Sequence, residues 1–207
     1  NKPINSFYHG SNGGISSVAS ESWKIEDSKY FRTKLDGSKG LTKSFKLPIN
    51  DQFELKRFLE LDKNLFYGSK HSLFRWDKKI STLMIENNLI KNNFLNAKKN
   101  VLDINISERG LSGRVTKLEI KLNHSDEPIV LVKDDIRRIL RFLPSNLFTI
   151  DKLNDNLWIF RGGGFGHGVG LSQSGAIEMA ELGFTYEQIL NHYYEGTKIK
   201  KIEILSQ

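Results

Sequence analysis

Residues 161–176 read RGGGFGHGVGLSQSGA, and six of the nine residues from 162 to 170 are glycine. Before this run, NLWIF at 156–160 has the apolar and aromatic content of a strand. After it, SGAIEMAEL at 174–182 has the spacing of a helix that Gly183 would end. Glycine lets a backbone approach another chain or a ligand closely, and a helix N-terminus offers unpaired N–H groups. The run is therefore a candidate binding loop at a strand-to-helix junction.

Two other interpretations of the glycine run remain open at this point. A nucleotide or phosphate loop is disfavoured, because the strict G-x-G-x-x-G spacing fails and no P-loop lysine follows. A tight structural turn with His167 as a buried, satisfied imidazole is the simpler alternative. Against that alternative, His167, Ser172 and Gln173 accompany the glycines, and a polar cluster is costly to bury unless its members have partners.

The rest of the chain interleaves short strands and short helices without regular βαβ spacing. This pattern predicts an α+β fold with mixed, largely antiparallel strands. Residues 20–50 are expected to be loops with brief strands. Strands are predicted at 72–80, 101–109, 113–122, 128–132 and 198–205. Helices are predicted after Asp51 (with Phe53, Leu55, Phe58 and Leu59 inward), after Ser81 (with Leu83, Met84, Leu89 and Ile90 inward), from Asp134 or Asp135 to Arg141, and at 186–194 with a Thr185–Gln188 capping box.

The charge distribution is uneven. The chain carries 31 Lys and Arg against 24 Asp and Glu, and residues 1–100 hold 18 of the basic and 10 of the acidic groups. Such a field attracts anionic polymers, lipids or nucleic acid. However, the lysines are scattered, and no zinc-finger spacing or RNP-like stretch occurs, so we expect no nucleic-acid partner. A solvated basic face without a dedicated partner is the simpler interpretation.

Composition excludes several classes of site. The chain has no cysteine, which rules out disulfides and thiolate zinc ligands. No stretch approaches the roughly 18 apolar residues of a membrane-spanning helix, so no membrane span is expected in this chain. The first residue is Asn rather than Met, and a preceding segment is therefore expected to have been removed.

The stretch at 160–197, FRGGGFGHGVGLSQSGAIEMAELGFTYEQILNHYYEGT, resembles the signature of the stage II sporulation protein D (SpoIID) family, which also occurs in amidase-enhancer proteins. Three further segments follow the family's order: NSFYHGSNGG at 5–14 with Trp23, SERGLSGRV at 107–115, and the stretch from Asp134 to Ile150. Residues 40–100 match weakly. The resemblance implies a single SpoIID-like domain over 1–207 that lacks its N-terminal segment, with an elaboration or inserted lobe at 40–100.

The resemblance also implies a function. The family cleaves peptidoglycan glycan strands as lytic transglycosylases and leaves 1,6-anhydro muramic acid ends. One Glu serves as acid and then as base, because the C6 hydroxyl of the sugar is the nucleophile. That Glu is expected before Asn1, so no catalytic residue is assigned within the chain, and no cofactor is expected. The expected location is extracytoplasmic, in the cell envelope or periplasm, with a cell-wall amidase or the missing N-terminal segment as further partners. The alternative is a non-catalytic wall-binding or amidase-stimulating module.

The same resemblance implies a substrate groove built from two polar, glycine-rich elements, and His9 and His167 are predicted to line one cleft. The implied substrate-binding residues are His9, Ser11, Gly13, Gly14, Arg114, Gly166, His167, Gly168, Ser172, Gln173 and Tyr193.

Each of these assignments has an alternative. His167, Ser172 and Gln173 would bind sugar hydroxyls or acetamido groups, or else form an internal network. Tyr193 would stack on a pyranose ring or belong to the core. Arg114, like Arg137, would pair with a substrate carboxylate or form a structural salt bridge. Some family members hold zinc near the first element with Cys; no metal site is expected here.

Overall fold

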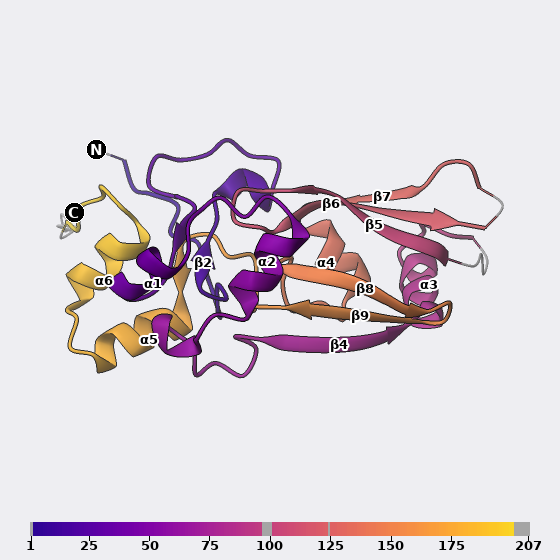
Figure 1. Cartoon of the computed structure of the whole chain (residues 1–207). Coiled ribbons are helices and arrows are strands. Elements are labelled where there is room, and N and C mark those ends of the chain that lie inside the picture. Colours follow the sequence, from indigo (N-terminus) through magenta and orange to yellow (C-terminus); the bar gives the residue numbers. More distant parts are fainter. Residues whose placement is uncertain (1, 97–100, 124, 201–207) are drawn as a thin grey trace.

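Two three-stranded sheets occupy one end of the molecule, and helices α1, α5 and α6 lie with both chain ends at the other end (Figure 1). The computed structural model describes residues 2–96, 101–123 and 125–200. Its elements are β1 Tyr8–His9, β2 Ile15–Ser16, a 3-10 helix Ala19–Glu21, β3 Lys34–Leu35, α1 Lys39–Ser44, α2 Gln52–Leu59, a 3-10 helix Lys63–Leu65, β4 Trp76–Ser81, α3 Thr82–Lys91, β5 Val101–Arg109, β6 Val115–Leu122, β7 Ile129–Val132, α4 Asp135–Leu140, β8 Phe148–Asn154, β9 Leu157–Gly162, β10 Leu171–Ser172, α5 Gln173–Glu181 and α6 Tyr186–Tyr193.

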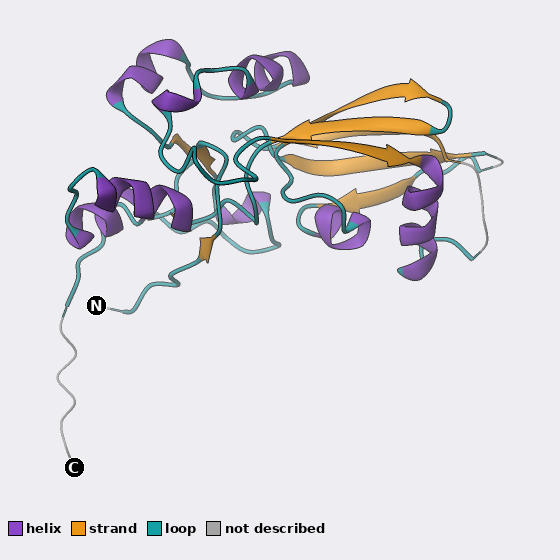
Figure 2. Ribbon diagram, turned by 90° about the horizontal axis from the view of Figure 1, so that it is seen from below, coloured by secondary structure: helices purple, strands orange, loops and turns teal. Residues whose placement is uncertain are grey.

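Both sheets are antiparallel, with strand orders β4-β9-β8 and β5-β6-β7. They share one hydrophobic core with α3 and α4, which cover the lower side of the strands in Figure 2. Trp158, Phe160 and Leu118 are among its fully buried side chains. The predicted α+β class with largely antiparallel strands is confirmed.

The predicted helix starts are confirmed by their capping bonds. Asp51 accepts a hydrogen bond from the backbone of Glu54, and Ser81 accepts one from Met84. Thr185 and Gln188 form the capping box that starts α6.

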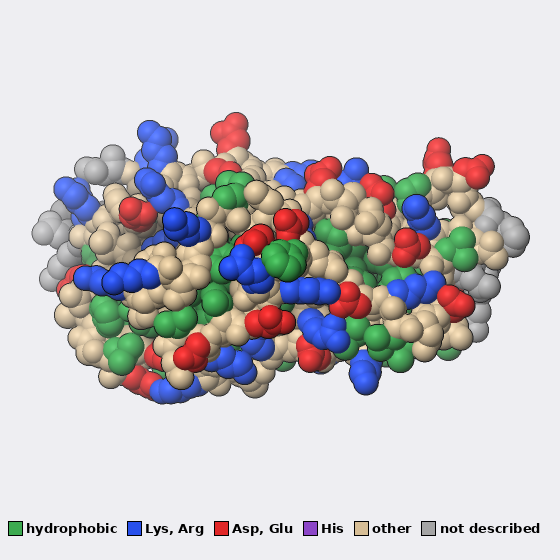
Figure 3. Space-filling view, in the orientation of Figure 1, with side chains coloured by type: hydrophobic (Ala, Val, Ile, Leu, Met, Phe, Trp, Pro, Cys, Tyr) green, Lys and Arg blue, Asp and Glu red, His purple; other side chains and the backbone are tan. Residues whose placement is uncertain are grey.

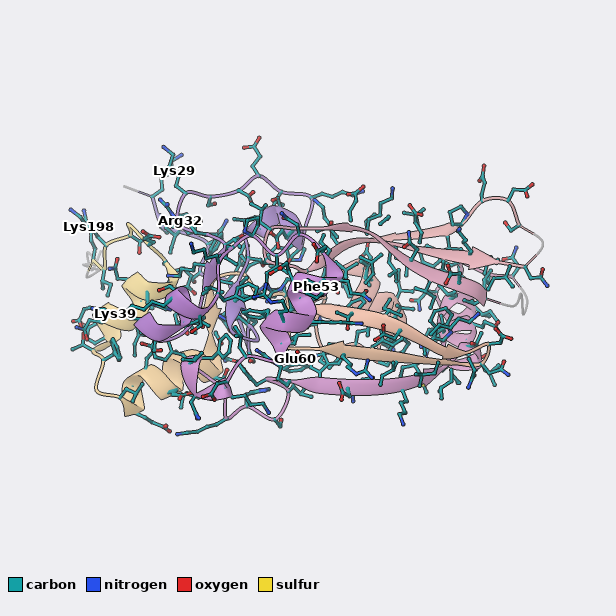
Figure 4. All side chains as sticks on the ribbon, viewed as in Figure 1. Lys29, Arg32, Lys39, Phe53, Glu60 and Lys198 are labelled. Atoms are coloured by element: carbon teal, nitrogen blue, oxygen red, sulfur yellow. The ribbon has the colours of Figure 1, made fainter. Side chains whose placement is uncertain are left out.

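The predicted inward faces were wrong at three positions. Phe53 is 68% exposed and lies on the outer face of α2 (Figure 4), while Leu83 and Met84 on α3 are also exposed. Helices this short turn toward the core only the side chains that their neighbours contact, so α3 buries Leu89, as predicted, together with Ile85, which was not predicted.

Three strand predictions need correction or completion. Strand β8 was not predicted, because Phe148, Thr149 and Ile150 are all buried and show no alternation. The strand expected at 72–80 begins only at Trp76. In the segment expected to close as a strand, residues 198–200 form none, and 201–205 lie outside the described residues.

The segment 40–100 contributes to the central structure. Strand β4 forms an edge of the sheet that contains β9, and α1 and α2 share a second hydrophobic cluster with Ile15 and Leu147. Arg75 packs against the aromatic rings of this cluster. Its guanidinium lies 4.2 Å from the centroid of the Phe74 ring and donates to the carbonyl of Gly13 at 2.8 Å. The aromatic cluster is thereby joined to the first glycine-rich element.

Acidic and basic side chains are mixed over the face shown in Figure 3. Lys29, Arg32, Lys39 and Lys198 lie at the end of the molecule that carries the chain ends (Figure 4). Among the described residues, no helix has the length and apolar character needed to cross a membrane.

Candidate functional site

The two glycine-rich elements lie against each other along their length. Strand β1 pairs in parallel with β10, with Tyr8 opposite Leu171 and His9 opposite Ser172. Between Ser11 and Phe165, two backbone hydrogen bonds of 3.1 and 2.7 Å run in both directions. The first element therefore lies on the glycine run and the start of α5, although more than 150 residues separate the two in sequence.

His9 and His167 lie side by side, with ring centroids 5.2 Å apart, so the two residues come together as expected. That they line a cleft stays a prediction, because His9 is only 5% exposed. His167 Nε2 donates to the carbonyl of Tyr8 at 3.0 Å, and its Nδ1 accepts from the backbone N–H of Val169. His9 Nδ1 donates to the carbonyl of Val169 at 3.1 Å, which leaves its buried Nε2 without a partner among the described residues. These bonds define a neutral tautomer for each ring.

Burial keeps both rings neutral. Desolvation lowers the pKa of His167 from 6.5 to about 4, and the charges of Arg137 and Arg114 act in the same direction. Desolvation likewise holds the pKa of His9 well below 6.5, with His167 and Arg114 adding to the effect. At neutral pH the pair consists of two uncharged imidazoles.

Arg114 lies beneath the loop with only 1% of its surface exposed. Its Nη2 donates to the carbonyls of Asn12 at 2.9 Å and Ile15 at 3.1 Å, both in the first element. In the second element, a Cβ on Gly168 would overlap the guanidinium, so only glycine leaves room for it. Burial lowers the pKa of Arg114 to about 10, which still leaves it charged at neutral pH. The expected contact with a substrate carboxylate is corrected: the guanidinium faces the interior and carries a structural role.

Glu21 provides the nearest opposite charge. It is 6% exposed and accepts hydrogen bonds from the backbone and the hydroxyl of Ser112. Desolvation raises the pKa of Glu21 above 4.5, although Ser112 and the charge of Arg114 oppose the rise. A Cβ at Gly110 would overlap the Glu21 side chain, which explains a glycine in the turn after β5. No sequence motif pointed to this contact.

The remaining predicted side chains divide into interior and surface groups. Ser11 is buried, and its hydroxyl accepts from the N–H of Gly13. Ser172 is also buried and accepts from the N–H groups of Asn12 and Gly175, which caps α5. The internal-network alternative therefore describes these two serines. Gln173 is exposed at the start of α5, and its side chain has no hydrogen-bond partner among the described residues.

Tyr193 belongs to the core and is 4% exposed, so the expected stacking on a sugar ring is corrected. Its hydroxyl donates to Asp36 at 3.0 Å, and burial together with that carboxylate raises its pKa above 10. Asp36 is fully buried and also bonds Asn12 Nδ2 at 2.6 Å and His192 Nε2 at 2.8 Å. This carboxylate joins the first element to α6. Sequence analysis missed it because a lone Asp before a glycine matches no motif.

The glycines of the two elements differ in exposure. Gly13, Gly14 and Gly168 are buried, whereas Gly166 and His167 are half-buried. Around them, Tyr8 is 64% and Phe165 48% exposed, and the half-buried Trp23 lies 4.7 Å from the His167 ring. Among the described residues, no group of three or more His, Asp or Glu side chains is placed to hold a metal ion. The accessible part of the site is thus aromatic and polar.

Replacing His167 by Gln should flatten the pH dependence of stability. In the folded state His167 takes up a second ring proton only near pH 4, whereas in the unfolded state it does so near pH 6.5. The free energy of unfolding therefore falls as the pH drops from 6.5 to 4. On going from pH 7 to pH 5, the wild type should lose about 1–2 kcal/mol more than H167Q. Urea unfolding at both pH values measures the difference, and equal losses would contradict the buried neutral imidazole.

Replacing Gly168 by Ala should destabilise the fold by at least about 2 kcal/mol more than replacing Gly183 by Ala. Both glycines have positive φ, 83° and 87°, so both variants carry similar backbone strain. Only at position 168 does the added methyl group meet the Arg114 guanidinium, because nothing lies within 4 Å of a Cβ at Gly183. Urea unfolding tests this, and equal losses for the two variants would show that Arg114 does not require the glycine.

Comparisons with known proteins give short matches. The chain is 42% identical to an uncharacterized protein of Brachyspira hyodysenteriae over 98 residues, and this aligned region is 46% of this chain and 25% of that protein. It is 52% identical to the stage II sporulation protein D of Bacillus subtilis over 40 residues, and this aligned region is 19% of this chain and 12% of that protein. It is also 44% identical over 48 residues to the amidase enhancer of Bacillus subtilis, covering 23% and 7%.

The chain thus spans a quarter or less of the length of these curated relatives. The two named relatives agree with the resemblance that the sequence motifs indicated. A family model matches residues 17–170, which is most of the chain. The chain therefore belongs to the family described as a domain of unknown function, DUF8618.

Proposed function

We propose that the two joined elements bind the glycan strands of peptidoglycan, and that the chain is part of a lytic transglycosylase that leaves 1,6-anhydro muramic acid ends. The observation that carries the proposal is the pairing of β1 with β10, because the two segments that resemble the family's signature meet there. The similarity to a stage II sporulation protein D and to an amidase enhancer supports it. The proposal places the protein outside the cytoplasm, in the cell envelope or periplasm.

The accessible groups at this junction suit a sugar polymer. Tyr8 and Phe165 offer exposed rings, which can pack against the C–H faces of pyranose rings. Gln173 offers both a donor and an acceptor for hydroxyl and acetamido groups. The interior groups described above hold the backbone between these side chains in one shape, which lowers the entropy cost of binding.

The proton donor for cleavage is proposed to come from another polypeptide segment, as the resemblance implies. Six Glu residues lie in or beside the matched segments; Glu108 and Glu187 are exposed, and the other four have partners. Glu21 is buried against Ser112, and Glu178 accepts from the backbone N–H of Gly68 at 2.6 Å. Glu181 and Glu195 form ion pairs with Lys70 and Arg32. General acid catalysis needs a donor within hydrogen-bond reach of the leaving oxygen, and none of these carboxylates lies in a motif that the resemblance assigns to the acid.

A second candidate is a wall-binding module that stimulates an amidase without cleaving glycan. The similarity to an amidase enhancer favours it. The two candidates differ in the product: only a transglycosylase, once its acid is supplied, forms anhydro ends.

Replacing Tyr8 by Ala should weaken binding to purified peptidoglycan about five- to thirtyfold, because an exposed aromatic contact contributes roughly 1–2 kcal/mol. Tyr186 is the matched control: it is also 64% exposed but is the first residue of α6, outside the paired strands. Sedimentation of the protein with insoluble peptidoglycan measures both variants. Failure of the wild type to bind, or equal weakening by Y8A and Y186A, would contradict the proposed surface.

Residues 1–207 alone should release no anhydromuropeptides from purified peptidoglycan. Anhydromuropeptides should be released once the segment that carries the acid is added. Chromatography of the soluble products measures this. Release by residues 1–207 alone would show that the acid lies within the chain, with Glu21 as the first residue to replace.

A further inference from the structure

A small pocket is lined in part by Trp23, whose ring contacts His167. It has a volume of about 230 Å³ and lies between the loop that carries Trp23 and Lys24 and the junction of β7 with α4, which supplies Lys133, Asp134 and Arg138. Pockets that hold drug-sized ligands measure roughly 300–1,000 Å³, so this one suits a single ring with its substituents.

The two walls of the pocket are tied together. The backbone N–H of Asp134 donates to the carbonyl of Ser22 at 3.1 Å, and Lys133 Nζ donates to the carbonyl of Trp23 at 3.0 Å. Lys133 has φ of 51°, and Asn146 Nδ2 donates to its carbonyl at 2.7 Å. The junction is therefore held in an uncommon backbone conformation, and the pocket exists before any ligand arrives.

Trp23 is the aromatic residue among those that line the pocket. Its ring contacts His167 and lies 4.9 Å from the centroid of Phe7, which fixes its orientation. The indole N–H of Trp23 has no partner among the described residues. By contrast, the indoles of Trp76 and Trp158 are buried and donate to Gly164 and Thr82 at 3.1 Å. Trp23 thus offers both a flat apolar surface and a free donor.

The charges around the pocket favour an anionic group. Lys24, Lys133 and Arg138 line it together with Asp134 and Asp135. Arg137 holds the Asp134 carboxylate through bonds of 2.5 and 3.0 Å, so that negative charge is already balanced. Arg138 is exposed and forms no ion pair with any described residue. Its planar guanidinium group is therefore free to bind a carboxylate.

We propose that this pocket binds one hexopyranose ring that carries a carboxylate, with the ring against Trp23 and the carboxylate toward Arg138. The inference rests on the proposed function, because the pocket would extend the glycan-binding surface past His167. It adds a preference for an acidic over a neutral sugar, which the surface around Tyr8 and Phe165 does not supply.

Titration with N-acetylmuramic acid and N-acetylglucosamine tests the pocket, because the two sugars differ only by the 3-O-lactyl group, which carries the carboxylate. We expect N-acetylmuramic acid to shift the indole N–H resonance of Trp23, but not those of Trp76 and Trp158, and to bind at least about fivefold more tightly than N-acetylglucosamine. R138Q should remove this preference, whereas R57Q, which changes an exposed arginine on α2, should keep it.

Equal affinity for the two sugars, no shift at Trp23, or a preference unchanged in R138Q would overturn the proposal. The outcome is distinguishable from failure of the proposed function. Sugar binding at Trp23 without sedimentation on peptidoglycan would contradict glycan-strand binding and keep the pocket. Sedimentation that depends on Tyr8, without a preference for the acidic sugar, would contradict only the pocket.

Discussion

A single buried guanidinium connects the parts of the chain that form the site. Arg114 donates to two carbonyls of the first element and packs directly under Gly168 of the second. A charge in this position is costly to desolvate and is stabilised by hydrogen bonds and by Glu21 nearby. Its location explains why a glycine is required above it, and its charge adds to the burial that keeps the two imidazoles neutral.

The polar cluster at the glycine run therefore has two layers. The inner layer consists of groups that bond one another or the backbone, such as Ser11, Ser172 and His9. The outer layer consists of Tyr8 and Phe165, whose exposed rings the inner layer positions. Asp36 and Arg75 extend the inner layer, since one joins it to α6 and the other to the aromatic cluster. Rigid support under an adaptable surface is the arrangement expected of a binding site.

Sequence patterns predicted those features that depend on local chemistry. Capping residues located the starts of α2, α3 and α6, and alternation located β5 and β6. Features that depend on long-range packing were not predictable in the same way. Strand β8 is buried on both faces at its start and so shows no alternation, and the inward faces of α2 and α3 depend on neighbours that periodicity does not reveal.

The candidate site shows the same division. The resemblance between segments far apart in sequence predicted that His9 and His167 meet, and they do. The resemblance did not reveal which of the site residues face solvent, because the burial of Arg114 and Tyr193 follows from the three-dimensional fold alone. The contacts of Glu21 with Ser112 and of Asp36 with Tyr193 join residues about 90 and 157 positions apart and carry no local signature.

The most direct test of the account is a crystal structure of the chain with a soluble tetrasaccharide of alternating N-acetylglucosamine and N-acetylmuramic acid. The account predicts that the saccharide lies across the junction of β1 and β10, in contact with Tyr8 and Phe165, while Arg114 keeps its bonds to Asn12 and Ile15. A saccharide bound on the sheets at the opposite end of the molecule, away from both elements, would contradict it.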